Sequence, residues 1–258
     1  MTNDDGVAAP ALPALARSLA PLGEVRVVAP DRERSWIGKA ITRFDPVRVT
    51  EVERGGVAMR AVSGFPADCV QLSAYVLFDS PPALVVSGIN LGYNHGAAYV
   101  ASSGTIGAAL EGGIAGIPSL ALSAGTVERS WAEWRPWAET PDAAPMWERL
   151  AGVAADLAAA MLESAPPGAV VSANLPDDAD LTTERRLATV APVAYDRLFG
   201  EQDPGVFVHA YTGGLQEIGP MTGSDIEAAM DGVIAISAIS GIGGGTLAEG
   251  LARSLGVA

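Results

Sequence analysis

Short apolar runs alternate with stretches of leucine and alanine at helical spacing along the first 185 residues. Four leucines recur at intervals of three and four, which predicts a helix, and residues 24–30 behind them have the pattern of a strand. The four are Leu12, Leu15, Leu19 and Leu22. Alternation of this kind is typical of an α/β fold, a doubly wound sheet with helices on both faces.

Residues 83–90 form a nearly continuous apolar run that turns polar at its end. This is the pattern of a buried parallel strand that delivers polar residues to the carboxyl edge of its sheet. Further elements are predicted as a helix at 108–115, a strand at 119–123, a helix at 147–163 and a strand at 169–175. Residues 124–146, rich in Pro, Thr and Trp, are predicted to be irregular.

The pattern changes beyond residue 185. Residues 187–192, 206–211 and 232–239 are strand-like, with Gly and Pro between them, so we expect a β-rich section over 186–258. Within it, the glycines of residues 241–246 predict a flexible connector.

The composition of the chain excludes or disfavours several classes of function. Sixteen basic against thirty acidic side chains give a net charge of −14, which disfavours nucleic-acid polymers as partners. The only lysine, Lys39, is followed by Ala40, so a Walker A loop is excluded, and no glycine fingerprint for a dinucleotide follows the first strand. We predict a cytoplasmic protein with no membrane contact, because Cys69 stands alone and neither a signal peptide nor a membrane-length apolar run is present.

Oxygen-bearing side chains gather in four segments that the pattern places in loops. In a strand, the adjacent carboxylates of Asp4 and Asp5 would point to opposite faces, so a shared site requires a turn, which Gly6 permits. The others are residues 29–35, 87–94 and 102–107. Each also has a simpler explanation: an Asp-Gly turn, a solvated loop, an Asn-rich turn and a helix N-cap.

Taken together, the four loops favour a hard cation. Asp, Ser, Asn and Thr oxygens without a cysteine suit Mg²⁺, Mn²⁺ or Ca²⁺ better than Zn²⁺. A helix N-terminus beside such an ion binds anions, which indicates hydrolysis of a phosphoryl group.

The same segments, in the same order from residue 2 to about 240, resemble the SurE survival-protein family of 5′/3′-nucleotidases. The matching motifs are Asn-Asp-Asp-Gly at 3–6, Val-Ala-Pro-Asp-Arg at 28–32 with Ser35, Pro-Ala-Asp-Cys-Val at 66–70, Ser-Gly-Ile-Asn at 87–90, Ser-Gly-Thr at 103–105, Ala-Leu-Glu-Gly at 109–112 and Asp-Ile-Glu-Ala at 225–228. The resemblance implies a Rossmann-like metal- and phosphate-binding core, here residues 1–185. It also implies that residues 186–258 serve oligomerisation within a single SurE-like domain, giving a homodimer or homotetramer.

The resemblance further implies one Mg²⁺ or Mn²⁺ per subunit and hydrolysis of nucleoside 5′- and 3′-monophosphates. The implied metal ligands are Asp4, Asp5, Ser35 and Asn90, with one of the two Asp residues as the base that activates water. The implied phosphate contacts are Asn94, Ser103, Gly104 and Thr105. Which Asp acts as the base stays open.

Two departures from the family pattern favour an alternative function. The family's first core strand is absent before residue 2, so we expect the natural protein to start a few residues upstream of Met1. The family's Gly-Asp-Asp is replaced by Gly96-Ala97-Ala98. The alternative is a weak or inactive member that binds nucleotide or metal as a sensor or scaffold.

Aromatic residues stand beside two of the predicted ligands. Trp36 follows Ser35, and Tyr93 follows the Asn90 loop. Either ring could stack on a nucleobase, or instead cover apolar surface or an oligomer contact. We predict His95 as a surface histidine, with proton donation to the leaving oxygen as the alternative.

Overall fold

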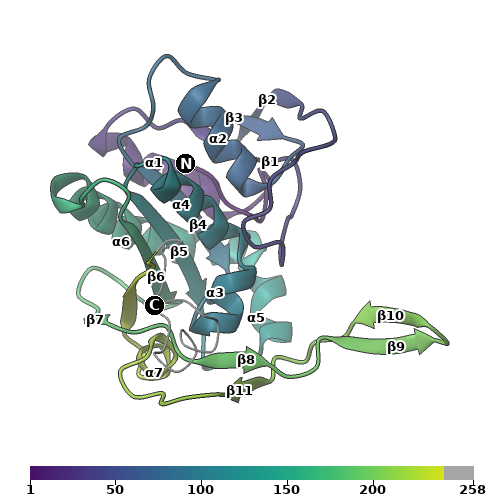
Figure 1. The fold of residues 1–258 in the computed structure, drawn as a ribbon. Coiled ribbons are helices and arrows are strands. Elements are labelled where there is room, and N and C mark those ends of the chain that lie inside the picture. Colours follow the sequence, from purple (N-terminus) through teal and green to yellow (C-terminus); the bar gives the residue numbers. More distant parts are fainter. Residues whose placement is uncertain (241–258) are drawn as a thin grey trace, which may run out of the picture.

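A five-stranded sheet forms the centre of the protein in the computed structural model, which describes residues 1–240 (Figure 1). The strand order is β4-β5-β6-β12-β7. Strands β4 (Val85–Leu91), β5 (Ser119–Gly125) and β6 (Val170–Pro176) are parallel. Strand β12 (Ile234–Ala238) is antiparallel to β6 and parallel to β7 (Arg185–Leu187). The predicted connector at 241–246 lies outside the described residues.

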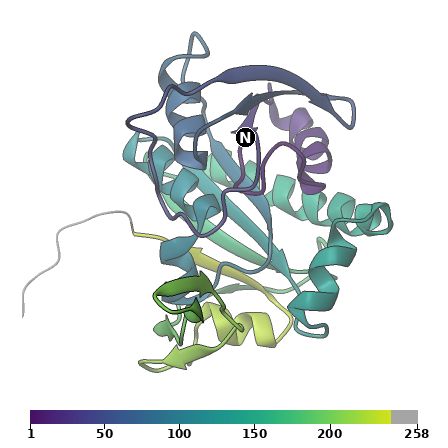
Figure 2. The same cartoon turned by 90° about the vertical axis from the view of Figure 1, so that its right-hand side faces the viewer.

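Helices cover both faces of this sheet (Figure 2). Val86, Leu120 and Leu122 pack on one face, in the same cluster as α1 (Ala11–Leu19) and α6 (Ala144–Ser164). The alternate residues Val85 and Ala121 point to the other face, which is covered by α2 (Pro66–Tyr75) and α4 (Gly104–Ile114). Every residue of β4 and β5 is buried, as a strand covered on both faces requires. The predicted doubly wound, Rossmann-like architecture is confirmed.

A second sheet of order β1-β3-β2 adjoins the first through the amino-terminal residues. It consists of β1 (Val27–Pro30), β3 (Val57–Val62) and β2 (Val49–Arg54). The carbonyl of Met1 accepts from Val28 N–H at 3.0 Å, while Thr2 N–H donates to the Val86 carbonyl at 2.9 Å. Met1 and Thr2 therefore lie between β1 and β4, in the position of a central strand.

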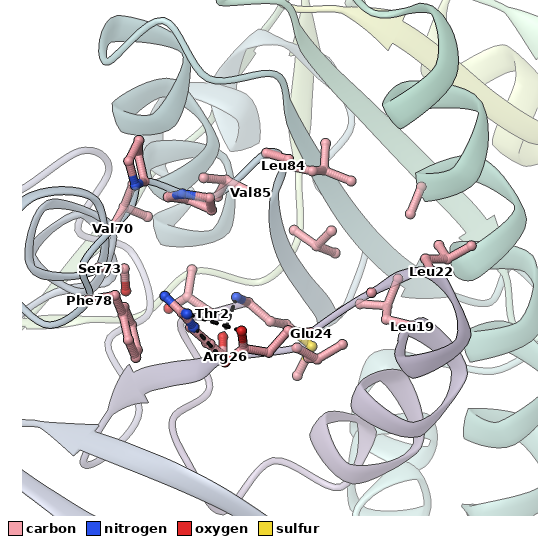
Figure 3. Close-up of a pocket in the computed structure, with 18 of the residues that line it drawn as sticks. Thr2, Leu19, Leu22, Glu24, Arg26, Val70, Ser73, Phe78, Leu84 and Val85 are labelled. Atoms are coloured by element: carbon pink, nitrogen blue, oxygen red, sulfur yellow. Dashed lines mark hydrogen bonds and ion pairs between the residues drawn. The ribbon is translucent and has the colours of Figure 1, made fainter.

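Met1 and Thr2 also line one end of a groove of about 300 Å³. Figure 3 shows residues that form this groove. Its walls are mainly apolar, and they include Leu19, Leu22, Val70, Phe78, Leu84 and Val85. At one end of the groove the Met1 ammonium group donates to the Arg26 carbonyl at 2.8 Å. A strand upstream of Met1 would lie along this groove, and such further residues stay a prediction.

The sequence pattern predicted an irregular segment at residues 124–146, and this prediction is wrong. They contain α5 (Trp131–Ala138), a 3₁₀ turn at Pro141–Ala143 and the start of α6. The Glu133 carboxylate accepts from the Ser130 N–H and caps α5, and Pro141 stands in a first turn, where a missing N–H costs little. Trp134 and Trp147 are fully buried, so packing fixes a segment whose composition suggested a loop.

The helix predicted at 108–115 begins earlier than expected, at Gly104, with Ser103 as its N-cap. The strand predicted at 187–192 is also misplaced, because β7 ends at Leu187. Helices α2, α3 (Gly96–Ser102) and α7 (Asp225–Met230), with strands β2 and β3, lie where the sequence pattern had indicated no element.

Residues 186–240 are β-rich, as predicted. Strand β8 (Val193–Tyr195) pairs with β11 (Leu215–Glu217), and β9 (Phe199–Asp203) pairs with β10 (Val206–His209) in a hairpin that projects from the body (Figure 1). Strand β12 then returns to the main sheet. A boundary at residue 185 and a role in oligomerisation stay predictions. None of the helices within residues 1–240 has the length and apolarity needed to cross a membrane.

A short Val/Ile extension fused before Met1 is expected to enter the groove as a strand and raise the melting temperature. Each buried side chain contributes on the order of 1.5–3 kcal/mol, and 1 kcal/mol corresponds to roughly 2–4 °C in a domain of this size. Calorimetry against a Gly-Ser extension of equal length measures the difference. Equal melting temperatures would show that the groove does not accept a strand.

Candidate metal and phosphate site

Asp4 and Asp5 lie in a turn between the two sheets. The turn is closed by Asn3, whose side-chain amide donates to the Gly6 carbonyl and whose oxygen accepts from the Gly6 N–H, both at 3.1 Å. Gly6 has φ +86°, and a Cβ there would lie 2.7 Å from the Arg32 carbonyl carbon. Only glycine fits this close approach, and the turn presents the two carboxylates to one site.

The Asp4 carboxylate faces the amino-terminal end of α4. It accepts from the Thr105 hydroxyl at 2.5 Å. Asp4 is almost wholly buried, and this burial raises its pKa, while the Thr105 hydroxyl and the N–H groups at the start of α4 offset part of the rise. The Thr105 hydroxyl therefore orients Asp4, and the positive end of the helix stabilises its charge.

Asp5 points toward the carboxyl end of β4, where it accepts from the Leu91 N–H at 3.2 Å. Its pKa lies well above the ordinary value, first because of burial and then because of the charge on Asp4, with Glu33 adding to the effect and Arg135 opposing it. Neither Asp takes part in an ion pair within residues 1–240. A buried and a half-buried carboxylate that are both short of positive charge are suited to a divalent cation.

Asn90 and Ser35 belong to the segments that contact the acidic pair. Asn90 precedes Leu91 on β4, and its side-chain NH₂ donates to the Gly92 carbonyl at 2.6 Å, which leaves the amide oxygen as an acceptor. Ser35 follows Arg34, whose N–H donates to the Asp4 carbonyl at 2.6 Å. In this structure the Ser35 hydroxyl donates to Glu33 at 2.7 Å, a contact that a cation would replace.

The oxygen atoms available as metal ligands at this site fit a hard cation better than zinc. Within residues 1–240, no three His, Cys, Asp or Glu side chains gather into a metal-binding group. A cation at Asp4 and Asp5 would therefore rely on the hydroxyl and amide oxygens nearby, which are ligands that Mg²⁺ and Mn²⁺ accept.

Asn94 is held where β5 and β6 end. Its side-chain NH₂ donates to the Ser123 hydroxyl, and its N–H donates to the Asn174 side-chain oxygen, both at 2.9 Å. Sequence reasoning missed Ser123 and Asn174, although each stands near the carboxyl end of a predicted strand. The hydroxyl of Ser103 caps α4 by accepting from the Ile106 N–H at 3.1 Å, as the simpler N-cap explanation required.

Glu33 and Arg135 also lie near the site without having been predicted. The Arg135 guanidinium forms an ion pair with Glu33 at 2.8 Å and another with Glu139 at 3.3 Å. Helix α5 carries Arg135, so the incorrect prediction of an irregular segment hid this contact.

The aromatic candidates differ in exposure. The Trp36 side chain is 41% exposed and packs on rings from the β-rich section. Tyr93 is half-buried, and its ring stacks on His95 with centroids 5.1 Å apart. His95 is half-buried rather than fully exposed, its Nδ1 is buried without a hydrogen-bond partner among the described residues, and burial lowers its pKa.

Fold and site together define an α/β protein with an acidic, oxygen-rich site at the carboxyl edge of its sheet. The chain belongs to the SurE family, since the family model described as "Survival protein SurE" matches residues 1–196. The SurE protein of Aquifex aeolicus, known from a crystal structure, has the same fold: the TM-score is 0.72, with 29% identity over 98% of this chain and 96% of that one. The resemblance seen in the motifs is confirmed.

Curated relatives match part of the chain. A protein of Moorella thermoacetica named 5′-nucleotidase SurE is 47% identical over 181 residues, which are 68% of this chain and 63% of the relative. A protein of the same name from Methanopyrus kandleri is 52% identical over 123 residues, 48% of this chain and 47% of the relative. The matched part thus spans about half to under two thirds of these relatives' own length.

Asp5→Asn is expected to stabilise the metal-free protein at pH 7. The substitution removes a half-buried charge beside Asp4 while keeping an acceptor for the Leu91 N–H, so we expect a gain of about 0.5–2 kcal/mol in the free energy of unfolding. Urea unfolding in EDTA measures this gain.

The matched control is Asp68→Asn, at a buried carboxylate with good partners. Asp68 accepts from the Phe65 N–H at 2.8 Å and from the Thr42 hydroxyl at 2.6 Å, so its substitution is expected to destabilise by about 1–3 kcal/mol. If Asp5→Asn lowered stability as Asp68→Asn does, Asp5 would not be short of positive charge.

Proposed function

We propose that this chain is a metal-dependent phosphatase that hydrolyses nucleoside 5′- and 3′-monophosphates to nucleoside and phosphate. Relatives that are 47% and 52% identical to parts of this chain are named 5′-nucleotidase SurE. The observation that carries the proposal is the pair of adjacent carboxylates, with Asp4 buried at the start of α4 and Asp5 half-buried at the end of β4. Both have raised pKa values, and neither has an ion-pair partner among the described residues.

One Mg²⁺ or Mn²⁺ per subunit is part of the proposal, with Asp4, Asp5, Ser35 and Asn90 as its ligands. The ion would supply positive charge to a phosphoryl oxygen and lower the pKa of a bound water. The contacts of Asp4 and Asp5 with the ends of α4 and β4 support this assignment.

The chain's own residues then have distinct tasks. One of the two Asp carboxylates accepts the proton of the attacking water, a step that a raised pKa favours. The Ser103 hydroxyl, the N–H groups of Gly104 and Thr105 at the start of α4, and the Asn94 amide hold the phosphate oxygens. Tight fixation of Asn94 by Ser123 and Asn174 supports a positioning task for it.

Cytoplasmic location and assembly into a homodimer or homotetramer complete the proposal. Phe199 and Phe207 are 56% and 62% exposed on the projecting hairpin, and exposed aromatic side chains of this kind support a subunit contact there. A small nucleotide is the partner that the acidic surface tolerates best.

Phosphate release from AMP and GMP tests the activity. We expect turnover with Mn²⁺ or Mg²⁺, none in EDTA, and a loss in kcat of about 10²–10⁴-fold in Asp4→Asn and Asp5→Asn. Asp142→Asn, at an exposed carboxylate, is the control and keeps the wild-type rate. Full turnover in both site variants would reject the site. Metal-dependent nucleotide binding without release by the wild type would favour the sensor or scaffold alternative.

Thr105→Val tests the orientation of Asp4 separately. The variant keeps the side chain's shape but removes the hydroxyl that donates to Asp4, so Mn²⁺ affinity is expected to fall by about 10–100-fold. Thr105→Ser keeps the hydroxyl and should retain most of the affinity. Calorimetric titration with Mn²⁺ compares the two, and equal affinities would mean that the hydroxyl does not matter for the ion.

A further inference from the structure

Five aromatic side chains form one cluster beside the loop that carries Ser35. Trp36 lies at its centre, with ring centroids 4.8 Å from His209, 5.1 Å from Tyr195, 5.4 Å from Tyr211 and 6.0 Å from Tyr99. Three of these rings come from the β-rich section, which therefore packs directly on this loop. We refer to the five residues as the Trp36 cluster.

The tyrosines of the Trp36 cluster are held in place by their own hydroxyl groups. The Tyr195 hydroxyl donates to the Ala98 carbonyl at 2.8 Å, and that of Tyr211 donates to the Gly214 carbonyl at 3.0 Å. The hydroxyls of Tyr99 and Tyr211 are also 3.0 Å apart. The rings are therefore fixed, and Trp36, with 41% of its surface exposed, offers a preorganised apolar face to a ligand.

The cluster is connected to the phosphate site on two sides. Trp36 follows Ser35 directly, and two residues on, the Gly38 N–H donates to the Ser102 carbonyl at 2.8 Å. Tyr99 and Ser102 belong to α3, which leads into the Ser103 cap of α4 and lies beside β8 (Figure 1). A small molecule with its phosphate at the start of α4 thus has the Trp36 cluster next to it.

Trp36 also has a backbone conformation that side chains rarely adopt. Its φ is +61°, and it is the only non-glycine residue with a positive φ among residues 1–240. This backbone conformation is energetically unfavourable for an L-residue, and residues that adopt it are enriched at ligand-binding sites. Packing on Tyr195 and His209 holds the indole in this orientation.

Tyr93, the second aromatic candidate, is placed differently. Its ring lies over Gly125, where a Cβ would be 2.7 Å from the ring, and it stacks on His95. Burial raises the pKa of its hydroxyl above the ordinary value. Tyr93 is therefore a packing residue at the end of β5.

We propose that Trp36 is the nucleobase-binding residue of this site, that Tyr195 and His209 position its indole, and that Tyr93 does not contact the base. This inference rests on the proposed function, because it assigns the base of a nucleoside monophosphate to an aromatic face beside the phosphate position. It makes the β-rich section part of the substrate site, and it predicts preference for nucleotides over phosphate esters that lack a base.

The test compares AMP with ribose 5-phosphate as substrates of the full chain and its variants. Loss of one base-stacking contact lowers affinity by about 5–150-fold. Trp36→Ala should lower kcat/KM for AMP by that factor, mainly through KM, and lower that for ribose 5-phosphate far less. Trp36→Phe should recover most of the AMP value. Tyr75→Ala, which removes an exposed ring at the end of α2, is the control.

Binding of AMP in the presence of Mn²⁺, measured by calorimetry, keeps the inference testable even if no turnover occurs. Weaker AMP binding by Trp36→Ala with unchanged binding of inorganic phosphate supports base stacking, whatever the outcome for hydrolysis. Equal losses for AMP and ribose 5-phosphate would overturn the proposal, since Trp36 would then act on Ser35 alone. A changed oligomeric state in Trp36→Ala at unchanged AMP affinity would overturn it too, and would make the ring a subunit contact.

Discussion

The close approach of two like-charged carboxylates is the constraint on which the site depends. Desolvation raises the pKa of both Asp4 and Asp5, and the charge on Asp4 raises that of Asp5 further. The turn persists because Asn3 closes it and the ends of β4 and α4 supply donors to the two carboxylates. Strain of this kind, maintained by a surrounding fold, is what a cation-binding site requires before its ion arrives.

Burial on both faces made the central strands predictable, because it leaves a continuous apolar run such as 85–91. The start of α4 was missed for a reason that local propensity cannot reveal. A Cβ at Gly104 would lie 2.7 Å from the Asp4 Cβ, and one at Gly107 would lie 2.4 Å from the Gly38 carbonyl oxygen. These glycines allow close packing between distant segments, although their type suggests a loop. Helix α5 was missed likewise, because the Trp134 indole that anchors it donates to Asp177, 43 residues away.

Motif order predicted a set of site residues, and their roles as ligands stay a prediction. Their contacts could not be predicted, because whether a hydroxyl faces phosphate or carboxylate depends on tertiary structure. Thr105 was expected at the phosphate, and its buried hydroxyl donates to Asp4. The hydrogen bond that fixes Asn94 joins it to Asn174, which lies 80 residues further along the chain. The aromatic surroundings of Trp36 come from a section whose sequence showed only strand periodicity.

Charge explains why this site would need its cation. The guanidinium of Arg34 turns to the Ser63 carbonyl at 2.6 Å and pairs with Asp31, and Lys39 pairs with Glu111. Arg135, whose charge acts on Asp5, is shared between two glutamates. With these basic side chains engaged, the positive charge that a phosphate meets would come from a bound ion and the N–H groups of α4. A small monophosphate suits such a compact charge, whereas a long polyanion would meet the repulsion of a −14 surface.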